Sequence, residues 1–143
     1  MCAFERRPYF EDRALVEVVR EQLLHPADAC TVEILAYVFM PDHLHALVTG
    51  TTEASDSKRY AEVFRQRSSF HVRRVKRERL WQEGYFDRVL RAEEDTVDVV
   101  RYLIANPLRA GLCTDVREYP FIGSQRYSIE ELIEFVQTVG KSR

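Results

Sequence analysis

The chain has 143 residues, of which 45% are hydrophobic and 31% charged, and this composition is typical of one globular domain with a buried core. No apolar run approaches the ~20 residues that span a bilayer, and the start, MCAFERRPYFEDR, lacks the apolar region of a signal peptide. The three cysteines (Cys2, Cys30 and Cys113) are odd in number and widely spaced, which argues against a disulfide framework or a cysteine-based zinc site. We expect a single domain over residues 1–143 in a reducing cytoplasm.

The first half of the chain predicts one helix and two strands. Residues 11–24 carry an apolar stripe at helical spacing, and Pro26 ends this helix. Residues 31–40 are rich in β-branched and aromatic side chains, which predicts a strand. A turn at Pro41 and Asp42 leads into a second strand over residues 43–50. We expect these two strands to pair as a hairpin.

The second half adds mainly helices. Residues 57–79 predict a long basic helix, and residues 85–90 predict a short strand after a turn at Gly84. Residues 93–106 predict a helix whose acidic start suits the helix dipole and which ends before Pro107. A last helix is expected over residues 129–139. Few strands mixed with several helices favour an α+β fold with an antiparallel sheet.

The predicted basic helix carries the strongest local charge. Residues 58–79 hold nine basic and two acidic side chains, a net charge of +7. Such an excess suits a polyanion such as nucleic acid, although a solvated helix paired with acidic groups elsewhere explains it equally simply. The candidate DNA-binding residues are Lys58, Arg59, Arg65, Arg67, Arg73, Arg74, Lys76, Arg77 and Arg79.

Two histidines lie one residue apart in the segment MPDHLHALVTG. On a strand, His43 and His45 would point to one face while Leu44 points into the core. Two neighbouring imidazoles suggest a shared ligand, most simply a metal ion. The alternative is a pair that is merely exposed on the surface.

A tyrosine and an asparagine lie four residues apart near the end of the helix predicted at 93–106. Tyr102 and Asn106 would therefore share a helix face. Tyrosine can act as a covalent nucleophile, and the amide oxygen of Asn106 could complete a hard-cation site beside the histidines. Such a cation would polarise a phosphoryl oxygen. The ordinary alternatives are a tyrosine in the core and an asparagine that caps the helix.

Three segments, MPDHLHALV, LWQEGYFDRVLR and RYLIANPLRAGL, together resemble the single-tyrosine HUH transposases, in particular the REP-associated tyrosine transposases. HUH denotes His–hydrophobe–His, which His43, Leu44 and His45 match. The resemblance covers about residues 30–125. It implies a ferredoxin-like or RRM-like antiparallel sheet packed with helices, with the histidine pair on a central strand and the tyrosine on a following helix.

The resemblance also implies a site and a reaction. Tyr102 and Asn106 match the Tyr-x-x-x-Gln/Asn pattern of the family, in which the tyrosine is the nucleophile. A divalent ion, Mg²⁺ or Mn²⁺, would be held by His43, His45 and Asn106. The substrate would be single-stranded DNA with a foldback hairpin. Tyrosine attack would give a 5′-phosphotyrosine link and a 3′-OH, and the protein would act as a monomer or a homodimer.

Several assignments stay open. Tyr85 is a rival nucleophile, disfavoured because strand alternation pairs it with Asp87 rather than with an amide. Arg109 either contacts phosphate or caps the preceding helix. Four aromatic residues could stack on unpaired bases, although core packing is favoured for the second and fourth: Tyr60, Phe64, Phe70 and Trp81.

Two alternative functions remain. Most of the family's first strand is expected to be absent, which would leave a sheet edge open. The first alternative is therefore a relative with the same fold that binds DNA but no longer cuts it. An unrelated metal-dependent hydrolase would need ligands beyond the pair, and His25 and His71 are poorly placed to supply them.

Overall fold

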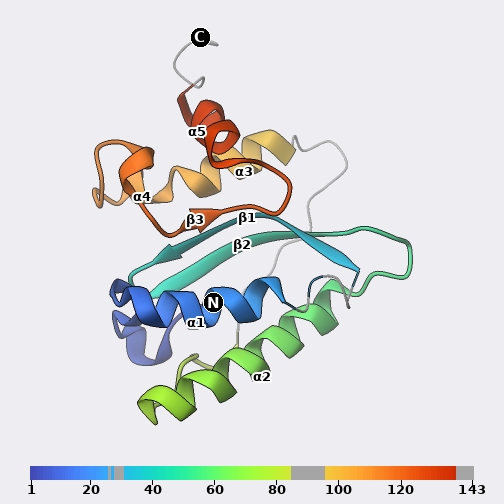
Figure 1. Ribbon diagram of the computed structural model, residues 1–143, viewed down its shortest axis with the longest axis vertical. Helices are drawn as coiled ribbons and strands as arrows, with labels where there is room; N and C mark the ends of the chain where they lie inside the picture. Colours follow the sequence, from blue (N-terminus) through green and yellow to red (C-terminus); the bar gives the residue numbers. More distant parts are fainter. Residues whose placement is uncertain (26, 28–30, 85–95, 138–143) are drawn as a thin grey trace.

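In the part of the chain that the structure describes, the fold is a three-stranded antiparallel sheet covered by helices on both faces. The computed structural model describes residues 1–25, 27, 31–84 and 96–137, called the described residues below. The strands lie side by side in the order β2-β1-β3 (Figure 1). Their bounds are β1 (Val32–Met40), β2 (His43–Gly50) and β3 (Ile122–Gly123).

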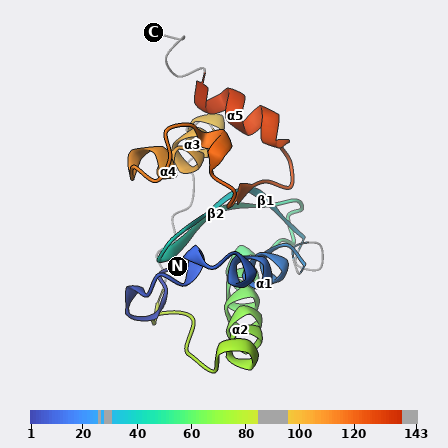
Figure 2. The ribbon, with the colours of Figure 1, turned by 60° about the vertical axis from the view of Figure 1, so that its left-hand side comes forward.

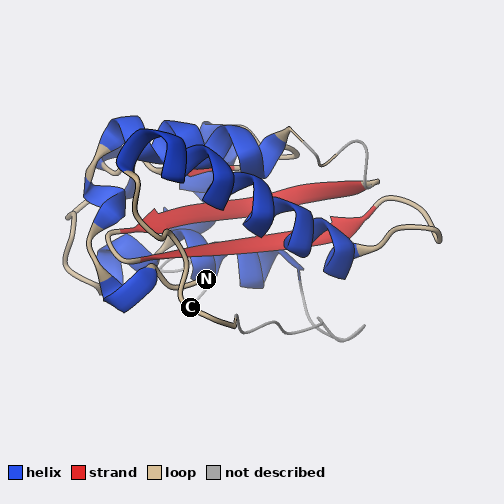
Figure 3. Ribbon diagram, turned by 90° about the horizontal axis from the view of Figure 1, so that it is seen from below, coloured by secondary structure: helices blue, strands red, loops and turns tan. Residues whose placement is uncertain are grey.

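The helices form two layers. One layer holds α1 (Arg13–Leu24) and α2 (Ser57–Lys76). The other layer, on the opposite side of the sheet, holds α3 (Thr96–Ile104), α4 (Asn106–Arg109) and α5 (Ile129–Gln137) (Figures 1 and 2). Seen from below, the long helix α2 lies across β1 and β2 (Figure 3). Short 3₁₀ turns occupy Phe4–Arg6, Tyr9–Glu11 and Val116–Glu118.

Aspartate caps set where the two long helices begin. The Asp12 carboxylate accepts from the first backbone N–H groups of α1, and Asp56 accepts from the backbone N–H of Arg59 in α2. The first helix therefore begins two residues later than predicted. The predicted basic helix ends three residues early, because Arg77 adopts a left-handed φ of 56° and turns the chain.

The predicted hairpin is confirmed. Met40 pairs with His43 and Val38 with His45 across the turn. Side chains of β1 alternate between two cores, so Phe39 packs with α1 and α2 while Val38 packs with α3 and α5. The sheet therefore separates two apolar cores, one under each helix layer.

The amino-terminal segment runs along the outer side of β2. Isolated β-bridges pair Cys2 with His43 and Ala3 with Trp81. In chain order, residues 1–3, α1, β1, β2, α2 and residues 80–82 form a β-α-β-β-α-β unit. The expected ferredoxin-like core is confirmed, and within the described residues its first and last strands are single bridges.

The strand order differs from the prediction that the histidine pair lies on a central strand. β2 is an edge strand of the three-stranded sheet. Among the described residues, its outer side is paired only at its start. There Cys2 forms a bridge with His43, and the N–H of Leu44 donates to the carbonyl of Met1 at 2.8 Å. Across the described residues, this pairing reaches no further than Leu44.

The helix predicted over 93–106 is interrupted. Its described part begins at Thr96 and ends at Ile104, and the separate short helix α4 begins at Asn106. Pro107 explains the break, since it lacks an N–H and its ring conflicts with the carbonyl four residues earlier. The prediction of one continuous helix to Asn106 is therefore wrong.

Some predictions fall outside the described residues. They are the strand at 85–90 with its rival nucleophile Tyr85, Cys30, and the end of the last helix beyond residue 137. Cys2 and Cys113 are free thiols. A search of the described helices finds none with the length and apolar character to cross a membrane.

Candidate functional site

The two histidine side chains lie on one face of the sheet. Leu44, between them, is buried in the core under α1 and α2, as predicted. The residues opposite the histidines, Met40 and Val38, belong to the other core, with α3 and α5. His43 and His45 therefore point toward the face that α3 and α4 cover, with ring centres 4.7 Å apart and ring planes 88° apart.

The electrostatic surroundings keep His45 neutral. His45 is exposed on one side. Desolvation of its imidazole by the surrounding protein, followed by the nearby charges of His43, the amino-terminal amine and Arg109, lowers its pKa from 6.5 to about 4. At neutral pH the ring therefore carries no charge and keeps a lone pair on one nitrogen. A neutral imidazole is the form of histidine that binds metal ions.

An aspartate in the hairpin turn holds His43. Asp42 Oδ1 lies 2.7 Å from Nδ1 of His43, and Asp42 Oδ2 lies 2.9 Å from Nε of Arg6. Burial raises the pKa of the Asp42 carboxyl, but the hydrogen bond with His43 and the charge of Arg6 outweigh it and the pKa lies below its ordinary value. The sequence predicts Asp42 only as a turn residue. An acid directly before the His-Leu-His triplet is the signal that could have identified it.

Tyr102 lies near the end of α3 with 67% of its surface exposed. Arg109, on α4, contacts it twice. The guanidinium carbon lies 3.7 Å from the centre of the phenol ring, and Nη2 donates to the carbonyl of Tyr102 at 2.6 Å. Arg109 therefore caps the end of the helix, one of the two predicted roles. It also lies close enough to His45 to affect its pKa.

Asn106 is partly buried at the first position of α4, where its carbonyl accepts from the N–H of Ala110. Because α3 ends at Ile104, the spacing of four residues does not place Tyr102 and Asn106 on one continuous helix face. The two residues instead flank the short turn at Ala105. The helix α3 packs on β1 and β2, and α4 contacts β1. The tyrosine, the asparagine and the imidazoles thus belong to the same layer of the molecule.

The histidine pair fits two nitrogen ligands of one metal ion. His45 is neutral, and the contact of His43 with Asp42 engages Nδ1, which leaves Nε2 for a ligand. Among the described residues, no group of three His, Cys, Asp or Glu side chains could hold a metal ion. Further ligands would have to come from an amide such as Asn106, from substrate or from water.

The basic helix α2 lies in the layer opposite the imidazoles (Figures 1 and 2). Four of the predicted DNA contacts in residues 58–79 are engaged within the protein. Arg65 donates to the Gln82 carbonyl at 2.6 Å, and Arg67 donates to the side chain of Gln22. Lys76 pairs with Asp12, and Arg79 donates to the Trp81 carbonyl. The five that remain most available to a ligand are Lys58, Arg59, Arg73, Arg74 and Arg77.

The structure separates the four candidate stacking residues. Tyr60, Phe64 and Trp81 are buried in the core under α1 and α2, so they pack rather than stack. Phe70 is 57% exposed, and the guanidinium of Arg74 lies 5.7 Å from its ring centre. A surface groove of about 400 Å³ runs beside this ring, lined by Gln66, Ser69, Phe70, Arg73 and Arg74.

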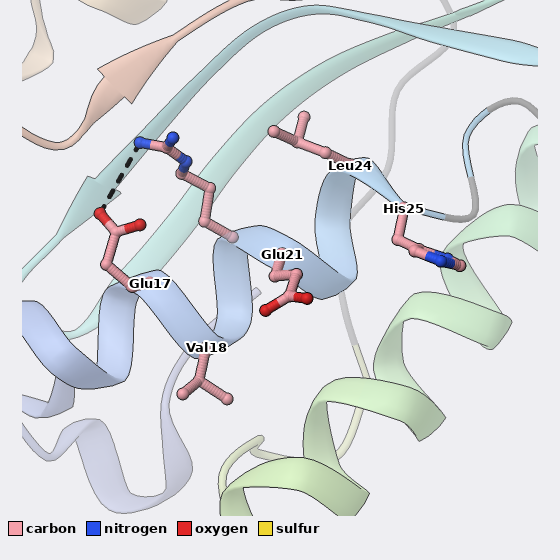
Figure 4. A pocket seen from close by; sticks show the side chains of 6 residues that line it. Glu17, Val18, Glu21, Leu24 and His25 are labelled. Atoms are coloured by element: carbon pink, nitrogen blue, oxygen red, sulfur yellow. Dashed lines mark ion pairs between the residues drawn. The ribbon is translucent and has the colours of Figure 1, made fainter.

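A larger surface hollow, of about 730 Å³, lies along α1 (Figure 4). Its lining includes Glu17 and Arg20, which form an ion pair at 3.7 Å, and His25 just after the helix. All of its lining residues come from α1 or its end, in the layer opposite the imidazoles. This hollow is therefore separate from the histidine site.

A ferredoxin-like core with a histidine pair under a tyrosine-bearing helix defines a class of small α+β proteins. A family model described as "Transposase IS200 like" matches residues 1–107. The chain belongs to this family of IS200-like transposases.

Two individual proteins are similar to the chain. The REP-associated tyrosine transposase of Escherichia coli (strain K12) is 30% identical over 90 residues, which cover 62% of this chain and 52% of that protein. The chain thus spans about half the length of this curated relative. A solved structure of the REP-associated tyrosine transposase bound to a REP hairpin matches with a TM-score of 0.71 and 21% identity, covering 85% of this chain and 71% of that one. The structural match shows a shared fold.

Proposed function

We propose that this chain is a transposase that nicks and rejoins single-stranded DNA folded into a hairpin. The observation that carries the proposal is that both imidazoles point toward the sheet face covered by α3, which bears the exposed Tyr102. The relatives support it, since both are named tyrosine transposases and one is bound to a REP hairpin.

Tyr102 is the proposed nucleophile. Its Oη attacks the scissile phosphorus and loses its proton to solvent, while the bond from phosphorus to the 3′ oxygen breaks. The leaving 3′ oxygen takes a proton from solvent, so the products are a 5′-phosphotyrosine and a strand that ends in a 3′-OH. Rejoining reverses these bond changes with a 3′-OH as the attacking group. The phosphodiester energy is conserved in the tyrosine link, so the cycle needs no nucleotide cofactor.

The proposed ligands of a divalent ion, Mg²⁺ or Mn²⁺, are His43, His45 and the amide oxygen of Asn106. When bound, such an ion supplies stabilisation of the charge that develops on a phosphoryl oxygen. The protein side of the site does the positioning. The guanidinium of Arg109 holds the backbone and ring of Tyr102 and adds a positive charge where a phosphate would approach.

Hairpin binding is assigned to the outer side of α2. Arginine side chains that are not engaged elsewhere in the protein can neutralise phosphates, and Phe70 offers a ring for an unpaired base. The local charge of +7 over residues 58–79 supports this assignment.

A DNA-binding relative that does not cut is the second candidate. The weak pairing of β2 on its outer side, limited among the described residues to His43 and Leu44, favours this candidate. An unrelated hydrolase is disfavoured because the remaining histidines cannot join the pair. His25 follows α1 and His71 lies on α2, both in the opposite layer.

The test is covalent capture of a labelled hairpin oligonucleotide on a denaturing gel, with Mn²⁺ present. Wild type and Tyr127→Phe, a matched tyrosine control that packs on Phe135, should form the adduct, whereas Tyr102→Phe should form none. Equal adduct from Tyr102→Phe would move the nucleophile elsewhere. Salt-sensitive hairpin binding without any adduct would favour the second candidate.

A further inference from the structure

A chain of polar contacts links the amino-terminal segment to the histidine pair. Arg6 Nη1 donates to Sγ of Cys2 at 2.8 Å, and Arg6 Nε lies 2.9 Å from Oδ2 of Asp42. The other oxygen of that carboxylate, Oδ1, lies 2.7 Å from Nδ1 of His43. Each carboxylate oxygen of Asp42 therefore has its own partner, one cationic and one an imidazole nitrogen.

We propose that Asp42 is a positioning residue for the metal site: its carboxylate accepts the Nδ1–H of His43, so that Nε2 carries the lone pair, and Arg6 holds the carboxylate in this orientation. The inference rests on the proposed function, because it takes His43 as a metal ligand.

The chemistry of imidazole makes the contact decisive. A neutral imidazole has one N–H donor and one acceptor nitrogen, and the partner of one nitrogen determines the role of the other. A carboxylate is only an acceptor, so the nitrogen facing Asp42 must carry the proton. The lone pair is then fixed on Nε2, the nitrogen further from the backbone.

The backbone around Asp42 limits its movement. Its carbonyl accepts from the N–H of Ala3 at 2.9 Å, and Asp42 itself lies in the tight turn between Met40 and His43. With the main chain paired and both carboxylate oxygens engaged, the side chain has little freedom to rotate. The orientation of the His43 ring relative to His45 follows from this restraint.

The conformation of the amino-terminal turn supports the role of Arg6. Glu5 and Arg6 both adopt a φ of 55°, in the left-handed region that residues other than glycine rarely occupy. Such a conformation persists only where surrounding contacts hold it, and it is found preferentially at functional sites. Here the turn directs the Arg6 guanidinium back toward Asp42 and Cys2.

The experiment uses the full chain labelled with ¹⁵N-histidine. Imidazole ¹⁵N shifts identify which nitrogen of His43 is protonated at neutral pH, and electron paramagnetic resonance of free Mn²⁺ measures metal affinity without DNA. Wild type should show the Nδ1–H tautomer. Asp42→Ala should lose the fixed tautomer and bind Mn²⁺ about 10–100-fold more weakly.

Two further variants separate positioning from folding. Asp42→Asn keeps the shape of the side chain but only one acceptor oxygen. Because Arg6 can only donate, that oxygen should face Arg6 and the NH2 group should face Nδ1 of His43, so this variant should favour the Nε2–H tautomer and bind Mn²⁺ more weakly than wild type. Arg6→Met replaces an exposed side chain and should weaken Mn²⁺ binding less than Asp42→Ala does. The matched control is Asp115→Ala, which breaks an ion pair with Arg117 at 2.6 Å elsewhere in the chain and should change neither reading.

The outcomes distinguish this inference from the proposed function. An Nε2–H tautomer or a doubly protonated ring at His43 in wild type would overturn it, and so would unchanged Mn²⁺ affinity in folded Asp42→Ala. If Asp42→Ala does not fold, an unchanged Nδ1–H tautomer in Asp42→Asn would overturn it instead. The expected tautomer in a protein that forms no DNA adduct would leave the positioning role intact and remove the transposase reaction.

Discussion

The guanidinium of Arg109 lies over the phenol ring of Tyr102, with its central carbon 3.7 Å from the ring centre. The same side chain donates to the Tyr102 carbonyl, so one residue of α4 restrains both the backbone and the ring of the proposed nucleophile. A tyrosine that is 67% exposed would otherwise be free to adopt several rotamers. Order at this ring therefore depends on a residue seven positions later.

Arg109→Met should slow phosphotyrosine formation by about tenfold, since a loss of roughly 1.4 kcal/mol corresponds to one order of magnitude. Methionine retains an apolar stem but lacks the charge and the planar donors. The rate of Arg109→Lys should lie between those of wild type and Arg109→Met, because lysine keeps the charge without the planar group that stacks on the ring. Single-turnover adduct formation measures the rate, and an unchanged rate in Arg109→Met would show that the stacking contact plays no part.

Exposed arginines near the end of α2, Arg73 in the helix and Arg77 directly after it, should set the salt dependence of hairpin binding. Replacing Arg73 and Arg77 together by alanine should reduce the slope of log affinity against log salt by about 2, roughly one unit for each lost phosphate contact. Arg117→Ala removes an exposed arginine beyond α4 that already pairs with Asp115 and is the matched control. An identical slope in the double variant would place the hairpin on another surface.

Two phenylalanines on α2 should respond in opposite ways. Phe70→Ala should weaken hairpin binding by roughly 1–3 kcal/mol, the usual contribution of a stacked base, with little change in stability because Phe70 is 57% exposed. Phe64 is only 2% exposed, so Phe64→Ala should lower the free energy of unfolding by about 3–5 kcal/mol. Fluorescence anisotropy and urea unfolding separate the two effects. If Phe70→Ala binds the hairpin as tightly as wild type, the Phe70 ring does not contact the DNA.

Tyr119 should make stability fall at alkaline pH. Its hydroxyl donates to the Phe39 carbonyl, and burial raises its pKa from 10.0 to about 12. Because the folded pKa lies above the unfolded one, the stabilisation is complete below pH 10 and is lost as the pH rises from 10 to 12. The free energy of unfolding lost over this pH range is on the order of 2 kcal/mol.

The measurement for Tyr119 is urea unfolding at pH 8 and at pH 11. Tyr119→Phe should be less stable than wild type by about 1 kcal/mol at pH 8, where the hydrogen bond is lost. The difference in the free energy of unfolding between wild type and Tyr119→Phe should narrow or reverse at pH 11. A constant gap at the two pH values would mean that ionisation of Tyr119 has no part in the alkaline loss.

The sequence predicts the hairpin well because alternation is local. Each side chain on β2 has its face set by its neighbours, so burial of Leu44 and the common face of His43 and His45 follow from the pattern alone. The bounds of β2 agree with the prediction at both ends. The helix break before Asn106 is a different matter: Pro107 predicts a helix that ends at Asn106, whereas α3 ends two residues earlier, at Ile104.

Contacts between distant segments are what the pattern does not show. The pairing of Cys2 with His43 and the contact of Arg6 with Asp42 join residues about 40 positions apart, and no periodicity encodes them. For the same reason, the net charge of α2 does not reveal that Arg65 and Arg67 are already engaged within the protein. Local pattern thus identifies the elements, whereas tertiary packing decides which side chains remain available.

The sheet places α2 on one side and the imidazole pair on the other. A nucleic acid held on α2 must therefore pass around an edge of the protein before its backbone comes near Tyr102. The thickness of the domain would then act as a ruler, fixing how many unpaired nucleotides separate the foot of a hairpin from the point of cleavage. The outer side of α2 could also be exchanged for one that suits a different hairpin while the chemistry on the far side stays unaltered.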